Sequence, residues 1–210
     1  MTANPKFRSQ GRPAWRRSLL AIAVALGLGA FAMTAPGARL LVWLGQTFAP
    51  RAAVGGPFSL VDQTGARRTD KDFAGHPMLL FFGFTHCPDI CPTTLASVGR
   101  WLDALGPEAD GLRPIFVTVD PERDTPAALA EYMSAFDSRI TGLTGTPAEI
   151  VSMLRTYRAY ARKTEAGDVE HTAALYLIDE TGALRRLISY NRPDDEIVAA
   201  LRELIVHDAP

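Results

Sequence analysis

Cysteine is scarce in this sequence: it has two, Cys87 and Cys91, four positions apart. A disulfide framework and a four-cysteine zinc module are therefore excluded, because each needs more cysteines. Acidic residues are absent from positions 1–51, whereas the rest of the chain carries 15 basic and 23 acidic residues, a net charge of −8. A domain of that sign is not expected to bind nucleic acid, because phosphate recognition needs a basic surface. Gly-rich phosphate loops, G-x-S-x-G elbows and zinc-protease helices are also missing.

A long uncharged run occupies positions 18–38, 21 residues that are almost all apolar or small. At ~1.5 Å per helical residue it would reach ~30 Å, about one bilayer core. Five basic residues precede it, so we predict a cytoplasmic tail over 1–17 and a transmembrane anchor over 18–38. A cleaved signal peptide is the alternative, because A-F-A at 30–32 resembles a cleavage site. We favour the anchor, because the apolar stretch exceeds a typical signal-peptide core. Either way, the remainder is expected outside the cytoplasm.

Beyond a linker over 39–56, apolar runs of strand length alternate with segments of helical period. We expect strands at Phe58–Val61, Met78–Phe84, Pro114–Val119, Ala173–Ile178 and Leu184–Tyr190, and helices at Pro92–Leu105, Pro126–Phe136, Thr146–Tyr160 and from Pro193. Two parallel strands joined by a crossover, then a hairpin and a closing helix, make a thioredoxin-like arrangement. The prediction for 57–210 is thus an α/β domain with a central mixed sheet flanked by helices.

The strongest chemical signal is the segment 83–92, G-F-T-H-C-P-D-I-C-P, at a predicted strand-to-helix junction. Backbone amides and the helix dipole favour an anion there, so we expect the pKa of the thiols to be lowered. On a helix, the spacing of Cys87 and Cys91 would place their Cα atoms ~6 Å apart, which permits a disulfide. The same spacing lets two sulfurs bind one soft metal ion. Inert buried cysteines are the alternative, which the flanking prolines and the extracytoplasmic location disfavour.

A two-cysteine metal site needs at least one more ligand. Of four histidines, His171 is the best placed, in the polar segment 168–172 just before a predicted strand. In a thioredoxin-like fold that segment lies beside the N-terminus of the active-site helix. Two thiolates and one imidazole suit Cu(I) and can hold Cu(II), whereas zinc would want a fourth ligand. His86 adjoins the first cysteine and is expected to support the site at most, while His76 and His207 are expected on the surface.

A third feature is the segment V-D-P-E-R-D-T-P, in which Asp120 follows the predicted strand Pro114–Val119. In open α/β sheets the C-terminal ends of the strands face the functional crevice. We expect Asp124 and Thr125 to cap the next helix. Asp120 is expected near the metal or at a partner surface.

With these motifs the sequence resembles the Sco/SenC family of membrane-anchored copper-binding proteins. The resemblance covers roughly 57–205 and the anchor, and its motifs lie at 61–65, 81–92, 120–125 and 171–172. It implies a thioredoxin-like fold in which Cys87, Cys91 and His171 bind one copper ion, as Cu(I) or Cu(II). It also implies that Asp120 takes part in metal handling or docking.

The resemblance further implies a role in assembling the binuclear copper centre of cytochrome c oxidase subunit II. The protein would deliver copper, reduce the cysteines of that centre, or do both, on the periplasmic face of the inner membrane. Its partners would be subunit II or a copper donor. We expect a copper chaperone rather than a turnover enzyme. A thiol-disulfide oxidoreductase is the alternative, and a peroxidase-like thiol enzyme is a third possibility. Reductase chemistry would survive loss of His171, whereas copper binding would not.

Overall fold

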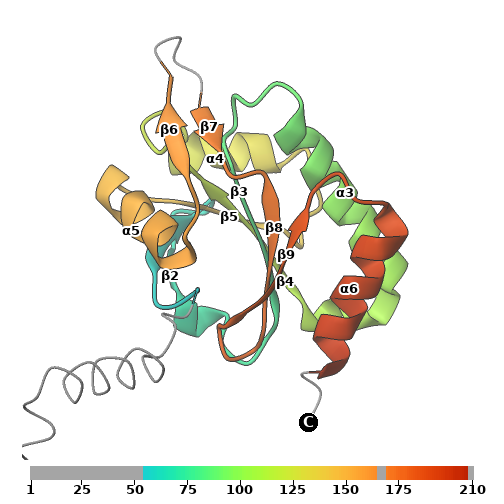
Figure 1. Ribbon diagram of the computed structural model, residues 1–210. Helices are drawn as coiled ribbons and strands as arrows, with labels where there is room; N and C mark the ends of the chain where they lie inside the picture. Colours follow the sequence, from blue (N-terminus) through green and yellow to red (C-terminus); the bar gives the residue numbers. More distant parts are fainter. Residues whose placement is uncertain (1–53, 165–168, 208–210) are drawn as a thin grey trace, which may run out of the picture. The chain divides into compact units, whose positions relative to one another are not determined.

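The computed structural model describes residues 54–164 and 169–207 (Figure 1). The predicted tail over 1–17, the anchor over 18–38 and most of the linker over 39–56 lie outside these residues. Within the described ranges, no helix has the length and apolar character needed to cross a membrane.

A seven-stranded mixed sheet forms the centre of the domain, in the order β2-β1-β5-β4-β3-β8-β9 (Figure 1). Its strands are β1 (Ser59–Asp62), β2 (Arg67–Thr69), β3 (Met78–Gly83), β4 (Arg113–Thr118), β5 (Thr141–Thr144), β8 (Ala174–Ile178) and β9 (Leu184–Ser189). The inner strands β3, β4 and β5 are parallel, and β8 and β9 continue the sheet as an antiparallel hairpin. This is the predicted thioredoxin-like mixed sheet.

Helices cover both faces of this sheet. They are α3 (Ile90–Leu105), α4 (Pro126–Met133), α5 (Pro147–Tyr157) and α6 (Asp194–His207), with short 3-10 turns η1 (Asp70–Asp72) and η2 (Gly106–Gly111). Every residue of β3 is buried, because alternate side chains enter two separate cores. Phe81 packs in the core that holds Trp101 of α3, whereas Phe82 packs in the core that holds Tyr157 of α5. Burial on both faces explains the continuous apolar run in the sequence.

Local sequence signals set several helix ends. Thr125 caps α4 by accepting a hydrogen bond from the Ala128 amide, and Thr146 forms a capping box with Glu149 at the start of α5. The prediction ran α5 to residue 160, but it ends at Tyr157 because Arg158 takes a left-handed conformation with φ 51°.

Three parts of the fold were missing from the sequence prediction: β2, β5 and a separate hairpin. This hairpin is formed by β6 (Ala161–Lys163) and β7 (Val169–His171), paired so that Ala161 lies opposite His171. Its strands have three residues each, too few to show the alternation on which strand prediction depends. Figure 1 shows the hairpin close to the loop that leads into α3.

Candidate metal centre

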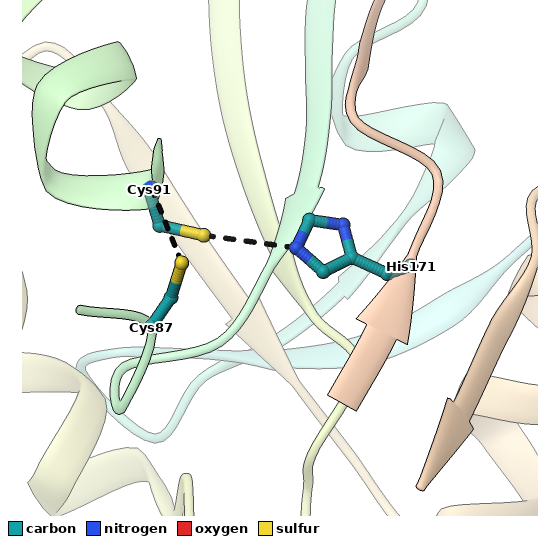
Figure 2. Close-up of side chains that lie close together, drawn as sticks. All are labelled: Cys87, Cys91 and His171. Atoms are coloured by element: carbon teal, nitrogen blue, oxygen red, sulfur yellow. Dashed lines mark hydrogen bonds between the residues drawn. The ribbon is translucent and has the colours of Figure 1, made fainter. Parts of the chain in front are cut away.

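The side chains of Cys87, Cys91 and His171 come together although they belong to different elements. Their candidate ligand atoms all lie within 4.8 Å of one another, and Cys91 Sγ is 3.9 Å from His171 Nε2. Figure 2 shows the three side chains pointing toward a common space. Two sulfurs and one imidazole nitrogen are donors that soft copper prefers. The three residues could therefore hold one metal ion.

The two cysteines occupy different positions relative to α3. Cys87 lies in the turn after β3, where its amide donates to the Phe84 carbonyl at 3.2 Å. Cys91 lies in the first turn of α3, which begins at Ile90, two residues before the predicted start at Pro92. The Cys91 amide donates to Cys87 Sγ at 3.4 Å. Cys91 is fully buried, whereas Cys87 is a half-buried residue that lines a hollow at the surface.

His171 ends strand β7, whereas the sequence prediction placed it in a polar loop. The Phe84 and Phe81 rings form T-shaped pairs with the imidazole at centroid distances of 5.7 and 6.4 Å. Its Nδ1 lies 3.2 Å from the Thr172 carbonyl oxygen. That oxygen can only accept a hydrogen bond, so it favours a proton on Nδ1 and leaves the Nε2 lone pair for a metal.

Burial controls the electrostatics of the cluster. It raises the pKa of the Cys91 thiol, which corrects the expectation that the helix start lowers both thiol pKa values. Burial also lowers the pKa of His171, and the Thr172 carbonyl opposes that shift. At neutral pH Cys91 is therefore a thiol and His171 a neutral imidazole. A metal ion must displace the thiol proton on binding, whereas the imidazole is ready to coordinate.

The other predicted site residues lie outside the three-residue group. His86 is exposed, and its Nδ1 is 3.0 Å from Thr85 Oγ1 and 3.8 Å from Asp124 Oδ1. Asp120 is fully buried at the end of β4, where its carboxylate pairs with Arg123 and Lys163.

The two remaining histidines are His76 and His207. His76, expected on the surface, is half-buried with Nε2 3.1 Å from Arg113 Nη2. His207 is the last residue of α6, and the prediction for its side chain lies outside what the structure describes.

Asp124 is the residue whose role the sequence prediction missed. We expected it to cap α4 with Thr125, but Thr125 alone does so. The Asp124 side chain is fully buried and accepts hydrogen bonds from the Thr85 amide at 3.0 Å and the Thr85 hydroxyl at 2.6 Å. It thus binds the turn that carries Cys87. The sequence contains no local signal for this contact, because Thr85 and Asp124 are 39 positions apart.

A hollow of ≈ 490 Å³ opens beside Cys87 and His171. Phe84, Pro88 and Ala173 supply apolar parts of its lining. Glu170, which faces solvent, lies at its rim. Cys87 and His171 therefore adjoin an open, largely apolar surface.

Gly83, which precedes the turn, leaves the space that the Cys91 sulfur occupies. A Cβ at this position would lie 2.7 Å from Cys91 Sγ and 2.6 Å from Phe116 Cε2. Gly83→Ala is therefore expected to destabilise the protein by about 1–3 kcal/mol and to weaken copper binding by displacing the sulfur. Denaturant unfolding and copper titration of the purified protein measure the two effects.

Gly99→Ala is the matched control, because a Cβ there would meet its nearest atom, Asp137 Cβ, at an ordinary 3.5 Å. In mid-helix this change is expected to stabilise the protein by about 0.5–1 kcal/mol without altering copper binding. Equal behaviour of the two variants would contradict the close packing described for Gly83.

Comparison with known proteins gives consistent matches. A sequence model of the SCO1/SenC family matches residues 46–206. The mitochondrial SCO1 homolog of Homo sapiens is 41% identical over 155 residues, 70% of this chain and 52% of that protein. The chain thus spans about half the length of the curated relatives it matches.

Solved structures match across most of their own length. ScoI of Bradyrhizobium japonicum, solved with copper bound, is 47% identical with a TM-score of 0.67 over 72% of this chain and 99% of that one. BsSco is described as having a disulfide switch and as a member of the Sco family of cytochrome c oxidase assembly proteins. It is 27% identical with a TM-score of 0.64, over 75% of this chain and 96% of that one.

Proposed function

The chain belongs to the SCO1/SenC family, and we propose that it handles copper by holding one ion between Cys87, Cys91 and His171. The observation that carries this proposal is the convergence of the three side chains, with ligand atoms within 4.8 Å of one another. Two sulfurs and one imidazole are donors that suit a soft copper ion. Related proteins solved with copper bound add support.

The proposed destination of the copper is the binuclear centre of cytochrome c oxidase subunit II. BsSco, a structural relative, is described as belonging to a family of cytochrome c oxidase assembly proteins. We further propose that residues 18–38 anchor the chain in the inner membrane and that the described domain faces the periplasm. The basic residues before this segment support that orientation.

The different positions of the two cysteines relative to the hollow suggest how copper is released. An acceptor ligand would enter through the hollow, where it meets the half-buried Cys87 and His171. Cys91, with no exposed surface, would be the last ligand to let go. Transfer would then proceed through an ion shared between this chain and the acceptor, and reprotonation of the Cys91 thiol would favour release.

The cysteine pair also supports a redox role, either as an off state for copper or as a reductase. In the reductase reaction, the Cys87 thiolate attacks one sulfur of a partner disulfide, the other partner sulfur leaves as a thiolate, and a mixed disulfide forms. The Cys91 thiol gives its proton to that leaving thiolate and attacks the Cys87 sulfur, which releases the second partner sulfur and leaves a Cys87–Cys91 disulfide. The partner thus gains the two electrons that the cysteine pair loses. The amide of Cys91 favours Cys87 as the attacking thiolate, because it donates to that sulfur at 3.4 Å.

Copper titration of the purified full-length protein in its dithiol and disulfide forms tests the proposal. The dithiol form is expected to bind one equivalent tightly in competition with a chelator. The disulfide form is expected to bind more than about 100-fold more weakly, because two of three ligands are lost, and loss of a residue that merely orients a ligand already costs about 10–100-fold. Equal affinity of the two forms would exclude this site. A dithiol form that exchanges disulfides but binds no copper would favour the reductase.

A further inference from the structure

The segment Asp120–Asp124, between β4 and α4, contains two fully buried carboxylates. Neither belongs to the group of three candidate ligands. Asp124 contacts the turn that carries Cys87, which we call the cysteine half of the site. Asp120 contacts the hairpin that carries His171, which we call the histidine half. Burying a carboxylate is costly unless its oxygens are well paired, so these contacts define where the attached segments can lie.

The cysteine half is bound through Asp124. Both of its carboxylate oxygens accept hydrogen bonds from Thr85, two positions before Cys87. The hydroxyl of Thr118 on β4 donates to Asp124 Oδ2 at 2.5 Å. On the main chain, the Asp124 carbonyl accepts from the hydroxyl of Thr144 on β5 at 2.7 Å. The turn that carries Cys87 is thereby fixed to two central strands of the sheet.

The histidine half is bound through Asp120. Lys163 Nζ lies 3.1 Å from Asp120 Oδ1 and 2.5 Å from Glu122 Oε2 of the same segment, and Lys163 is the last residue of β6. Because β6 pairs with β7 in a register that sets Ala161 opposite His171, these ion pairs restrain the hairpin that ends at His171. Strands β6 and β7 take no part in the seven-stranded sheet, so the position of the hairpin is set by the packing of Val169 in the core and by ion pairs such as these.

One hydroxyl connects the two halves. Thr118 Oγ1 accepts from the Asp120 amide at 3.0 Å while it donates to Asp124. The Asp124 amide in turn donates to the Asp120 carbonyl at 2.9 Å. A single short segment thus holds both carboxylates in a fixed relation to each other.

We propose that Asp120 and Asp124 are positioning residues that hold the two halves of the metal site at the spacing one copper ion requires. Asp124 sets the place of the Cys87 turn, and Asp120 acts through Lys163 on the hairpin of His171. This inference rests on the proposed copper function.

Three substitutions test the proposal in the full-length protein. Asp124→Asn weakens the acceptor for Thr85, and Thr85→Val removes one donor to it. Lys163→Met removes the ion pairs that join the hairpin to Asp120 and Glu122, while keeping the aliphatic stem. Each is expected to lower copper affinity by about 10-fold or more, as loss of residues that orient ligands does. Each is also expected to shift the sulfur-to-Cu(II) charge-transfer absorption, because the sulfur or the imidazole moves relative to the ion.

Asp179→Asn is the matched control. Asp179 is 2% exposed and accepts hydrogen bonds from the Thr181 amide and hydroxyl and from the Ala183 amide. It follows Ile178, which pairs with Met78 at the end of β3 remote from the cysteines. Its replacement is expected to reduce stability while changing copper affinity by less than about twofold, as for distant independent sites.

The readouts separate the possible results. Reduced affinity and a shifted spectrum in the three variants, with neither in Asp179→Asn, would support the inference. Wild-type affinity and spectrum in Asp124→Asn, Thr85→Val and Lys163→Met would overturn it, as would equal losses in all four variants. Absence of copper binding by the unsubstituted protein would instead reject the proposed function itself.

Discussion

Replacing His171 by alanine is expected to lower the copper affinity of the reduced protein by more than about 100-fold. The imidazole supplies one of three ligands, and loss of a residue that only orients a ligand already costs about 10–100-fold. Its Nε2 lies 3.9 Å from Cys91 Sγ, and alanine offers no donor in its place. Competition titration against a copper chelator measures the loss.

His86→Ala is the control for this prediction. His86 is adjacent to Cys87 in sequence, but its ring lies beside Thr85 and Asp124. It is exposed, so its removal is expected to leave one copper equivalent bound at close to the unaltered affinity. Equal affinity losses in the two variants would contradict the assignment of His171 as the third ligand. Thiol-disulfide exchange should survive both changes, because neither removes a sulfur.

Replacing either cysteine by serine is expected to abolish tight copper binding and disulfide formation together. A hydroxyl is a hard and weakly acidic donor that soft copper disfavours, and it cannot form a disulfide. The stability effects should differ, because Cys91 has no exposed surface and Cys87 is half-buried. Cys91→Ser buries a hydroxyl in an apolar core, which costs about 1–3 kcal/mol, whereas Cys87→Ser should change stability less.

Copper titration, thiol counting and denaturant unfolding of Cys87→Ser and Cys91→Ser test this pair of predictions. A Cys91→Ser protein that still bound one copper equivalent with unaltered affinity and spectrum would refute a shared site. Equal stability of the two variants would contradict the deeper burial of Cys91.

The sequence predicted strands β1, β3, β4, β8 and β9 of the central sheet and missed β2 and β5, because only the former carry local signals. Buried strands such as β3 appear as apolar runs, and helix starts such as Thr125 and Thr146 carry capping residues. Strand β5 is only four residues long and contains Gly142. Its identity as a strand comes from the parallel partner β4, which is a tertiary contact that local patterns do not contain.

The prediction of the metal site likewise succeeded where the signal was local and failed where it depended on tertiary contacts. The motif around Cys87 and Cys91 and the position of His171 in the chain predicted which residues meet. The sequence did not predict the hairpin that carries His171, because strands of three residues show no periodicity. The raised pKa of Cys91 was also missed, since it follows from burial in the packed core. Asp124 was assigned to a helix cap, and only the fold brings it to Thr85.

X-ray absorption spectroscopy at the copper edge, on the full-length protein loaded with one equivalent, tests the central claim most directly. The predicted result is a first coordination shell of two sulfurs and one imidazole nitrogen, with the nitrogen lost in His171→Ala. A shell of oxygen and nitrogen alone, or with one sulfur only, would contradict a site formed by Cys87, Cys91 and His171.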